Sequence, residues 1–220
     1  TRCSRDWSSD VCSSDLSFGG CRSDICTSAR VQPAFEIRWV DAMETDSPLL
    51  VVTGIPAVGK TTFGRWLKES HGFEHMDVER NGGQELDRLG LHDQWDGIFQ
   101  SDEGAAEFVR CLRLRERASV IDYGFPPHLF EAMARLARNH VPIWWFDGDR
   151  SAARQSYLNR AGTSVNVDVF DRQIQSIDQH WSHIERVVDG RILKVLGADC
   201  HHTPPEKIFT QILNRDMQFR

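Results

Sequence analysis

The sequence predicts a three-layer α/β/α protein, in which helices cover both faces of a parallel sheet. Short apolar runs alternate with longer amphipathic segments between residues 49 and 213, as expected of strands joined by crossover helices. Several runs, such as residues 141–146, are apolar without interruption, which is typical of strands buried on both faces. A glycine-containing turn at residues 54–59 follows the first run, where a strand would pass into a helix.

Length and composition are those of one domain of ordinary size. The chain has 220 residues, of which 40% are hydrophobic, enough to bury a core. It carries 26 Lys and Arg against 32 Asp and Glu. A mildly acidic domain is a poor match for a general nucleic-acid binder, although a local basic pocket is not excluded. No apolar run approaches the length that spans a membrane, so we expect a soluble protein with no membrane partner.

The first residues differ in character from the rest. Residues 1–26 are rich in Ser, Asp, Arg and Cys and show neither helical nor strand periodicity. The segment from Asp6 to Leu16 resembles the translation of a common sequencing-library adapter, so we expect the natural protein to start at Met43. Residues 17–42 could be genuine upstream sequence or out-of-frame sequence. We therefore expect an artefact or disordered leader over residues 1–46, a folded domain over 47–215 and a tail over 216–220.

Cysteine usage indicates a reducing compartment. Four of the six cysteines lie in the first 26 residues, and only Cys111 and Cys200 lie in the body. Two isolated thiols predict a cytoplasmic protein without a disulfide framework. Cys200, His201 and His202 look like a metal cluster, but no fourth ligand stands at a suitable spacing, so we expect an exposed polar turn.

The most specific signal is a phosphate-binding loop. A short apolar strand over residues 49–53 is followed by a match to G-x-x-x-x-G-K-[ST]. Gly54 and Gly59 permit backbone angles and a close approach that a Cβ would block, so successive amides can point at a polyphosphate. The competing interpretation is an ordinary strand-to-helix turn. The expected nucleotide-binding residues are Gly54, Ile55, Pro56, Ala57, Val58, Gly59, Lys60, Thr61 and Thr62.

Two side chains of this loop carry specific chemistry. Lys60 can reach the β- and γ-phosphates of a nucleoside triphosphate, and the hydroxyl of Thr61 can bind Mg²⁺. The helix that begins near Lys60 turns its partially positive N-terminus toward the same anion. Thr62 is expected to cap or pack.

Further elements follow in alternation. The stretch from Gln84 to Gln100 is less regular and is either a substrate-covering insertion or plain core helix. We expect further strands over residues 73–78, 119–125, 141–146 and 191–196, and helices over residues 60–70, 101–117, 128–139, 150–159, 170–188 and 204–213.

Two carboxylates stand where strands end. Asp77 lies at the carboxyl end of the second strand, where ligands of open α/β sheets bind, and we expect it to accept the proton of an incoming hydroxyl or to hold that hydroxyl. The alternative is a surface acid or a helix cap. Asp122 lies near the carboxyl end of the third strand, and we expect it to hold Mg²⁺ with Thr61 or to act on the attacking group; the alternative is a cap of the next helix. Glu79 and Arg80 are weaker candidates.

Arginines follow the fourth strand. Arg154 and Arg160 lie on or just after a helix that, with a loop over residues 161–169 and the next helix, could form a lid. Guanidinium groups there can stabilise the charge that spreads during phosphoryl transfer. Surface arginines in salt bridges are the alternative interpretation. The turn over residues 197–199 is expected to border the nucleotide base.

The body from Leu49 to Leu213 resembles the small P-loop kinases, a group that includes shikimate, gluconate, adenylate and zeta-toxin kinases. The resemblance is specific over residues 54–61 and looser at the two carboxylates and the lid arginines. It implies the P-loop NTPase fold with a five-stranded sheet of order 2-3-1-4-5, a small helical lid, ATP and Mg²⁺ as ligands, and phosphoryl transfer to a small acceptor. Residues 124–127 replace the glycine-rich acceptor loop of shikimate kinases, and no acceptor-nucleotide signature of adenylate kinases is found.

The leading hypothesis is an ATP-dependent phosphotransferase that acts on a hydroxyl of a small molecule. The catalytic residues would be Lys60, Asp77, Asp122, Arg154 and Arg160. A regulatory or interaction module that binds ATP with weak or no hydrolysis is the alternative, and a kinase acting on nucleic-acid 5′ ends a third. The sequence does not fix the acceptor, the choice between ATP and GTP, or the oligomeric state.

Overall fold

A computed structural model describes residues 47–79, 83–126, 129–160 and 167–216, with the side chains of Arg160 and Asp216 left out. The chain divides into two units, Thr1–Arg38 and Trp39–Arg220. The first unit lies wholly outside the described residues, so the described fold is that of the second. The expected leader over residues 1–46 and most of the expected tail therefore stay predictions.

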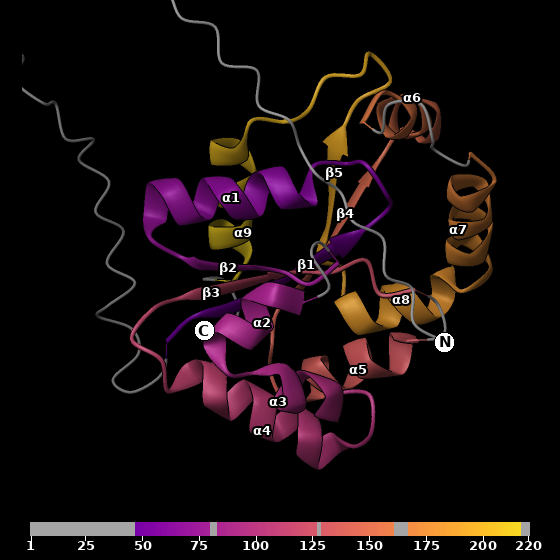
Figure 1. Ribbon diagram of the computed structural model, residues 1–220. Coiled ribbons are helices and arrows are strands. Elements are labelled where there is room, and N and C mark those ends of the chain that lie inside the picture. The colour runs from indigo at the N-terminus through magenta and orange to yellow at the C-terminus, as the bar shows by residue number, and fades with distance from the viewer. Residues whose placement is uncertain (1–46, 80–82, 127–128, 161–166, 217–220) are drawn as a thin grey trace, which may run out of the picture. The chain divides into compact units, whose positions relative to one another are not determined.

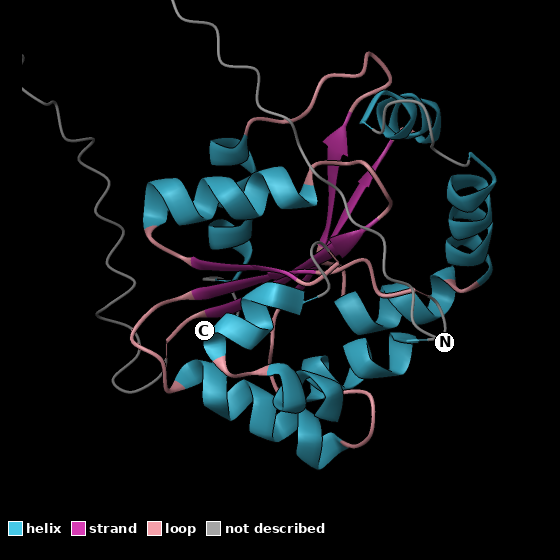
Figure 2. Cartoon of the chain, in the orientation of Figure 1, coloured by secondary structure: helices cyan, strands magenta, loops and turns pink. Residues whose placement is uncertain are grey.

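The centre of the fold is a five-stranded sheet in the order β2-β3-β1-β4-β5, and every neighbouring pair is parallel. Topology and fold class are as predicted. Figure 2 shows the strands gathered into one sheet between helices. The strands are β1 (Leu49–Gly54), β2 (Glu74–Asp77), β3 (Ser119–Asp122), β4 (Ile143–Gly148) and β5 (Ile192–Leu196).

Helices form a layer on each face of this sheet (Figure 1). One face is covered by α1 (Lys60–His71) and α9 (Pro205–Asp216), which meet where Trp66 contacts Phe209. The other face is covered by α4 (Asp102–Arg113), α5 (Phe130–Arg138) and α8 (Trp181–Val188). The remaining helices are α2 (Gln84–Leu89), α3 (His92–Gly97), α6 (Arg150–Arg160) and α7 (Val167–Gln179).

The apolar run of β4 shows why this strand lies inside. Trp145 and Phe146 are fully buried and point to opposite faces. Phe146 contacts Phe63 of α1 with ring centroids 5.4 Å apart, and Trp145 contacts Trp181 of α8 at 5.9 Å. A strand that must fill both faces has no position for a polar residue, which explains its uninterrupted apolar sequence.

Local signals explain several helix ends. Gly72 ends α1 in the left-handed conformation at φ 70°, and its N–H donates to the carbonyl of Leu67. The hydroxyl of Ser101 accepts from the N–H of Gly104 and so caps α4. Within residues 84–100, Gly90 at φ 66° separates two short helices in a stretch whose residues follow no regular pattern.

Several predicted bounds are wrong. The third strand ends at Asp122 and not at residue 125, and the helix expected over residues 101–117 ends at Arg113. The helix expected over residues 170–188 is two helices, because His180 leaves the helical conformation at φ −106° and its ring binds the carbonyl of Ser176. Both helices are amphipathic, so the apolar periodicity runs across the break without a signal. The fourth strand begins at Ile143 and extends to Gly148, two residues later than expected.

Candidate active site

The predicted phosphate-binding loop joins β1 to α1 at the carboxyl edge of the sheet. Gly54 ends β1 at φ 136°, and a Cβ there would overlap the backbone of Phe146 on β4. The N–H of Ile55 donates to the carbonyl of Phe146 at 3.2 Å, which fixes the start of the loop against the neighbouring strand. Ala57 at φ 65° and Gly59 at φ 98° are both left-handed, so the backbone curls before the helix begins.

The Lys60 side chain lies inside this curl. It is 8% exposed, and its Nζ donates to the carbonyls of Ile55 at 3.1 Å and Gly54 at 3.3 Å. A buried ammonium needs such partners, because removing it from water is otherwise costly. The loop therefore concentrates a positive charge at its centre, held by acceptors that a phosphate oxygen can replace.

The N-terminus of α1 adds to this positive potential. Its cap residue Gly59 offers no side chain to the first N–H groups, and the first turn of the helix contains no acidic residue. The partial positive charge of the helix end is therefore not neutralised by the helix itself. Thr61 is half-buried in that first turn and Thr62 is exposed.

Asp122 is the buried carboxylate of the site. It ends β3, is 3% exposed, and its Oδ2 has no hydrogen-bond partner among the described residues. In the register of the sheet it pairs with Val52 of β1 on one side and Asp77 of β2 on the other. Residues paired in this way share a face, and α1 packs over β1, β2 and β3. Asp122 thus lies under the helix that carries Lys60 and Thr61.

Asp77 lies at the carboxyl end of β2, partly buried, beside Asp122. Two residues on, Glu79 accepts a hydrogen bond from the N–H of Gly124 at 2.7 Å and so ties the segment after β2 to the segment after β3. Burial, with a smaller effect of the Glu79 charge, raises the pKa of the neighbouring Tyr123. Arg80 lies outside the described residues.

The lid arginines are placed differently. Arg154 on α6 donates to both carboxylate oxygens of Asp171 on α7, at 3.0 and 3.3 Å. That hydrogen bond, with the charge of Asp171, raises the pKa of Arg154. The structure therefore pairs Arg154 with α7 and does not bring it to the loop. The side chain of Arg160 lies outside the described residues.

A cavity of about 640 Å³ adjoins the loop, between the segments that follow β4 and β5. His202 links it to the loop, because the ring Nδ1 lies 3.3 Å from the point that a Cβ on Gly59 would occupy. The turn over residues 197–199, expected to border the base, lines this cavity. Arg150 lines it too and pairs with Asp147 at 3.1 Å. Neither His202 nor Arg150 could be assigned to the site from the sequence, since no motif marks them.

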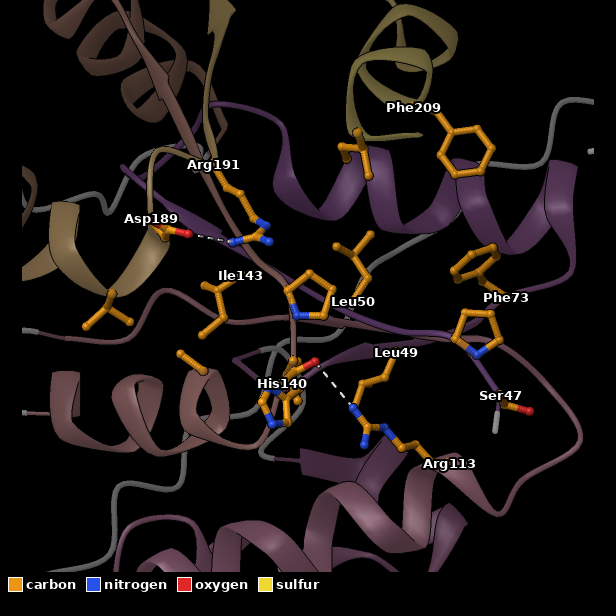
Figure 3. Close-up of a pocket in the computed structure, with 16 residues that line it drawn as sticks. Ser47, Leu49, Leu50, Phe73, Arg113, His140, Ile143, Asp189, Arg191 and Phe209 are labelled. Carbon is orange, nitrogen blue, oxygen red and sulfur yellow. Dashed lines mark hydrogen bonds and ion pairs between the residues drawn. The ribbon is translucent and has the colours of Figure 1, made fainter. Parts of the chain in front are cut away.

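A second cavity, of about 530 Å³, lies at the opposite edge of the sheet, where the strands begin (Figure 3). Its wall is mixed, with the apolar Leu49, Leu50 and Phe73 near the strand starts and several polar and charged side chains beside them. Arg113 donates to the carbonyl of His140 at 3.3 Å, and Arg191 lies 3.7 Å from Asp189. None of the residues that line it belongs to the predicted site, and the phosphate-binding loop is at the other edge.

The structure thus brings together the loop with Lys60 and Thr61, and the neighbouring carboxylates Asp77 and Asp122, at one edge of the sheet. It leaves Arg154 in an ion pair elsewhere. The parallel sheet of order 2-3-1-4-5 between helix layers, with the loop after β1, is the three-layer α/β/α P-loop NTPase fold that the sequence predicts. No helix of the described residues is long and apolar enough to cross a membrane.

Comparison with known proteins agrees with this class. No family model matches the chain. A "Putative adenylate kinase" of Pyrococcus abyssi (strain GE5 / Orsay) is 28% identical over 172 residues, which cover 75% of this chain and 82% of that protein. Membership of the P-loop kinases, and of a subgroup within them, stays a prediction.

Two solved structures are also similar. A gluconokinase from Sinorhizobium meliloti 1021 is 13% identical with a TM-score of 0.48, and covers 80% of this chain and 98% of its own. A shikimate kinase from Acinetobacter baumannii in complex with shikimate is 17% identical with a TM-score of 0.49, and covers 77% and 94%. At these values the fold assignment depends on the topology of the sheet itself.

Proposed function

We propose that this protein transfers the γ-phosphoryl group of ATP to a hydroxyl of a small molecule. The observation that carries the proposal is the loop closed around the Lys60 ammonium, at the edge where Asp77 and Asp122 end neighbouring strands. The similarity to a relative named as a kinase supports the phosphotransferase class. ATP as the donor and a hydroxyl as the acceptor are parts of the proposal itself.

The loop and Lys60 would bind the triphosphate. Phosphate oxygens would take the place of the Gly54 and Ile55 carbonyls as acceptors for Nζ, so the buried ammonium keeps its partners when the nucleotide enters. The open N-terminus of α1 would attract the same anion. The cavity beside His202 would hold the nucleoside.

The residues fit a Mg²⁺ ion as well. The carboxylate of Asp122 is only 3% exposed, and a buried carboxylate needs a positive charge nearby. Thr61 and Asp122 would hold the ion, since hydroxyl and carboxylate oxygens are ligands that Mg²⁺ prefers. When bound, Mg²⁺ supplies neutralisation of the charge on the β- and γ-phosphates.

Asp77 would act on the acceptor. Its carboxylate would take the proton of the acceptor hydroxyl while that oxygen forms a bond to the γ-phosphorus, and the bond to the bridging oxygen of ADP breaks. Arg154 and Arg160 would stabilise the spreading charge after closure of the lid. For Arg154 this requires exchange of Asp171 for a phosphate oxygen.

The test is acceptor-dependent ADP formation by the full chain. Sugars, nucleosides, aminoglycosides and cyclic hydroxy acids supply hydroxyl acceptors, and AMP supplies a phosphate acceptor because the Pyrococcus relative is named for it. ADP formation with a member of the first group supports the proposal. Transfer to AMP alone overturns the hydroxyl acceptor and keeps the phosphotransferase. Binding of ATP and Mg²⁺ without transfer to any of them favours the alternative.

That alternative is a module that binds ATP and signals by its conformation. The pairing of Arg154 with Asp171 favours it, because this guanidinium is then engaged with α7 and must leave its partner before it can act on the phosphates. The variant Asp77→Ala separates the two functions. In a kinase it abolishes transfer and preserves nucleotide binding. In a binding module it leaves any basal hydrolysis unchanged.

A further inference from the structure

A buried polar pair lies behind the phosphate-binding loop. His75 of β2 is 7% exposed and Asp122 of β3 is 3% exposed. The Nε2 of His75 lies 3.8 Å from the Oδ2 of Asp122, and neither atom has a hydrogen-bond partner among the described residues. The two atoms face each other at slightly more than hydrogen-bond distance, so a small movement of either side chain would join them.

Gly64 of α1 makes room for this histidine. A Cβ at residue 64 would overlap the Nε2 and neighbouring ring atoms of His75. A glycine inside a helix costs about 0.5–1 kcal/mol relative to alanine. The helix therefore carries a weak helix former at the point where the imidazole enters.

The position of the ring connects three parts of the site. Gly64 follows Lys60 by one helical turn, so both lie on the face of α1 that covers the sheet. His75 pairs with Val120 in the register, two residues before Asp122 and on the same face. The imidazole thus lies between α1 and the carboxylate, directly behind the loop.

A space-filling histidine is the simpler interpretation, and it explains the pair poorly. An apolar side chain would fill the same volume without a buried, unpaired nitrogen, which costs about 1–3 kcal/mol. A nitrogen that faces a carboxylate oxygen has a partner within reach. A small movement of the Asp122 carboxylate would bring its Oδ2 within hydrogen-bond distance of the His75 Nε2.

We propose that His75 is a positioning residue for Asp122. Its Nε2–H donates to Oδ2 in the nucleotide-bound state and fixes the carboxylate, so the other oxygen faces the divalent cation. This inference rests on the proposed function, which makes Asp122 a metal ligand. Hydrogen bonds to a ligating carboxylate typically change metal affinity by about 10–100-fold.

The test measures cation binding and not turnover. Full-chain protein with a non-hydrolysable ATP analogue is titrated with Mn²⁺ as a paramagnetic substitute for Mg²⁺, and free Mn²⁺ is read by electron paramagnetic resonance. We expect His75→Phe to weaken Mn²⁺ binding by about 10–100-fold. Binding of the analogue in EDTA should stay at the wild-type level, because the loop is untouched. His75→Gln, which keeps an N–H donor, should restore most of the affinity.

Two further variants keep the experiment decisive. Gly64→Ala should displace the ring and weaken Mn²⁺ binding as His75→Phe does. Ser119→Ala is the matched control, since Ser119 is also buried, lacks a hydrogen-bond partner for Oγ among the described residues and lies at the other end of β3. It should leave Mn²⁺ affinity unchanged. If His75→Phe does not fold, His75→Leu takes its place.

The outcomes separate this inference from the proposed function. Wild-type protein that binds neither analogue nor Mn²⁺ overturns the proposed function itself. Wild-type binding with equal Mn²⁺ affinity in a folded His75→Phe or His75→Leu protein overturns the positioning role alone. The positioning role is also overturned if His75→Phe loses as much affinity for the analogue in EDTA as it loses for Mn²⁺. It is overturned as well if His75→Gln fails to restore the Mn²⁺ affinity.

Discussion

Buried polar residues are few in the described part of the chain, and three of them gather behind one loop. Lys60, His75 and Asp122 are each less than a tenth exposed and lie under or on α1. Each costs free energy in an apolar interior unless a partner or a ligand compensates it. Their concentration at the carboxyl edge of the sheet is what the proposed binding of a nucleotide and a divalent cation requires.

The first prediction concerns Lys60. The variant Lys60→Met keeps the apolar stem and removes the ammonium. Hydrogen bonds to charged groups contribute about 1.5–3 kcal/mol, so we expect affinity for ATP and Mg²⁺ to fall by about 10–100-fold. Isothermal titration calorimetry measures it. Lys68→Met, on an exposed position of the same helix, is the control. Equal affinity of Lys60→Met and the wild type would contradict the phosphate-binding role.

The second prediction concerns Glu74 and acid. Glu74 accepts from Arg88 at 2.8 Å and from Arg115 at 3.1 Å. Partial burial raises its pKa, but the hydrogen bonds and charges of these arginines outweigh burial and lower the pKa below 4.5. Because the pKa is lower in the folded state, the stabilisation is present above about pH 4.5 and is lost as the pH falls through the folded value.

Glu74→Gln should therefore lower the urea midpoint at neutral pH and reduce the further loss on acidification. Urea unfolding followed by circular dichroism at several pH values measures both effects. Glu103→Gln, an exposed acid at the start of α4, should leave the pH dependence as it is. An acid dependence of Glu74→Gln identical to that of the wild type would show that another group carries it.

The third prediction concerns the Arg154–Asp171 pair. Both side chains are about half exposed, at 44% and 51%, so the pair is screened by solvent. Asp171→Asn should leave the urea midpoint nearly unchanged. If Arg154 acts on the phosphates, the same variant frees it and lowers the KM for ATP. A large loss of stability would show that the pair is structural, and an unchanged KM would remove Arg154 from the site.

At the scale of elements, the connection from β1 to α1 depends on its neighbour. The backbone of Phe146 on β4 leaves no space for a Cβ on Gly54. Gly72, at the end of α1, is also left-handed, but nothing among the described residues lies within 4 Å of the point that its Cβ would occupy. Substitution of Gly72 would therefore test the cost of the left-handed conformation alone. Substitution of Gly54 would test that cost together with the clash against β4.

The fourth prediction follows from that difference. Gly72→Ala should cost about 1–2 kcal/mol, the strain of a left-handed alanine. Gly54→Ala should cost more, because β1 and β4 must also separate, and it should abolish nucleotide binding. Urea unfolding and calorimetry on both variants give the comparison. An equal loss of unfolding free energy in the two variants would mean that β4 moves away from an added Cβ at little cost. The contact between Gly54 and Phe146 would then not determine the conformation of the loop.

The same scale shows what the sequence could predict. The turn from β1 into α1 was predictable because its whole signal lies in adjacent residues, and β1 and β4 were predictable because each is largely a short apolar run. The break at His180 was not, since the apolar pattern of α7 continues into α8 and no Gly or Pro stands between them. His75 was missed because one histidine in a four-residue strand has no local signal; its meaning comes from Gly64 and Asp122, which are distant in the chain.

At the scale of the molecule, the two edges of the sheet differ in chemistry. The carboxyl edge holds the loop, the paired carboxylates and a cavity, whereas the amino edge holds a cavity with a mixed polar and apolar wall, where Arg113 binds a backbone carbonyl (Figure 3). The order of strands followed from a resemblance to kinases and is confirmed. The pairing of Arg154 with Asp171 could not be predicted from the sequence, because it depends on how α6 packs against α7.

The fifth prediction concerns the melting temperature of the folded protein with and without ATP and Mg²⁺. A ligand that binds only the folded state stabilises it by about 2.7 kcal/mol at a concentration about a hundredfold above its Kd. ATP with Mg²⁺ should therefore raise the melting temperature of the wild type, measured by differential scanning calorimetry, and should raise that of Lys60→Met much less at the same concentration. Equal shifts would place the nucleotide outside the loop.

The all-parallel sheet also bears on synthesis of the chain. β1 has no partner close in sequence; its neighbours are β3 and β4, and the carbonyl of Phe146 receives the N–H of Ile55. On the ribosome, a nascent polypeptide must extend beyond residue 146 before its most specific motif has anything to close against. A fragment whose translation stops before residue 146 has the complete motif but lacks the strand β4 against which the start of the loop is fixed.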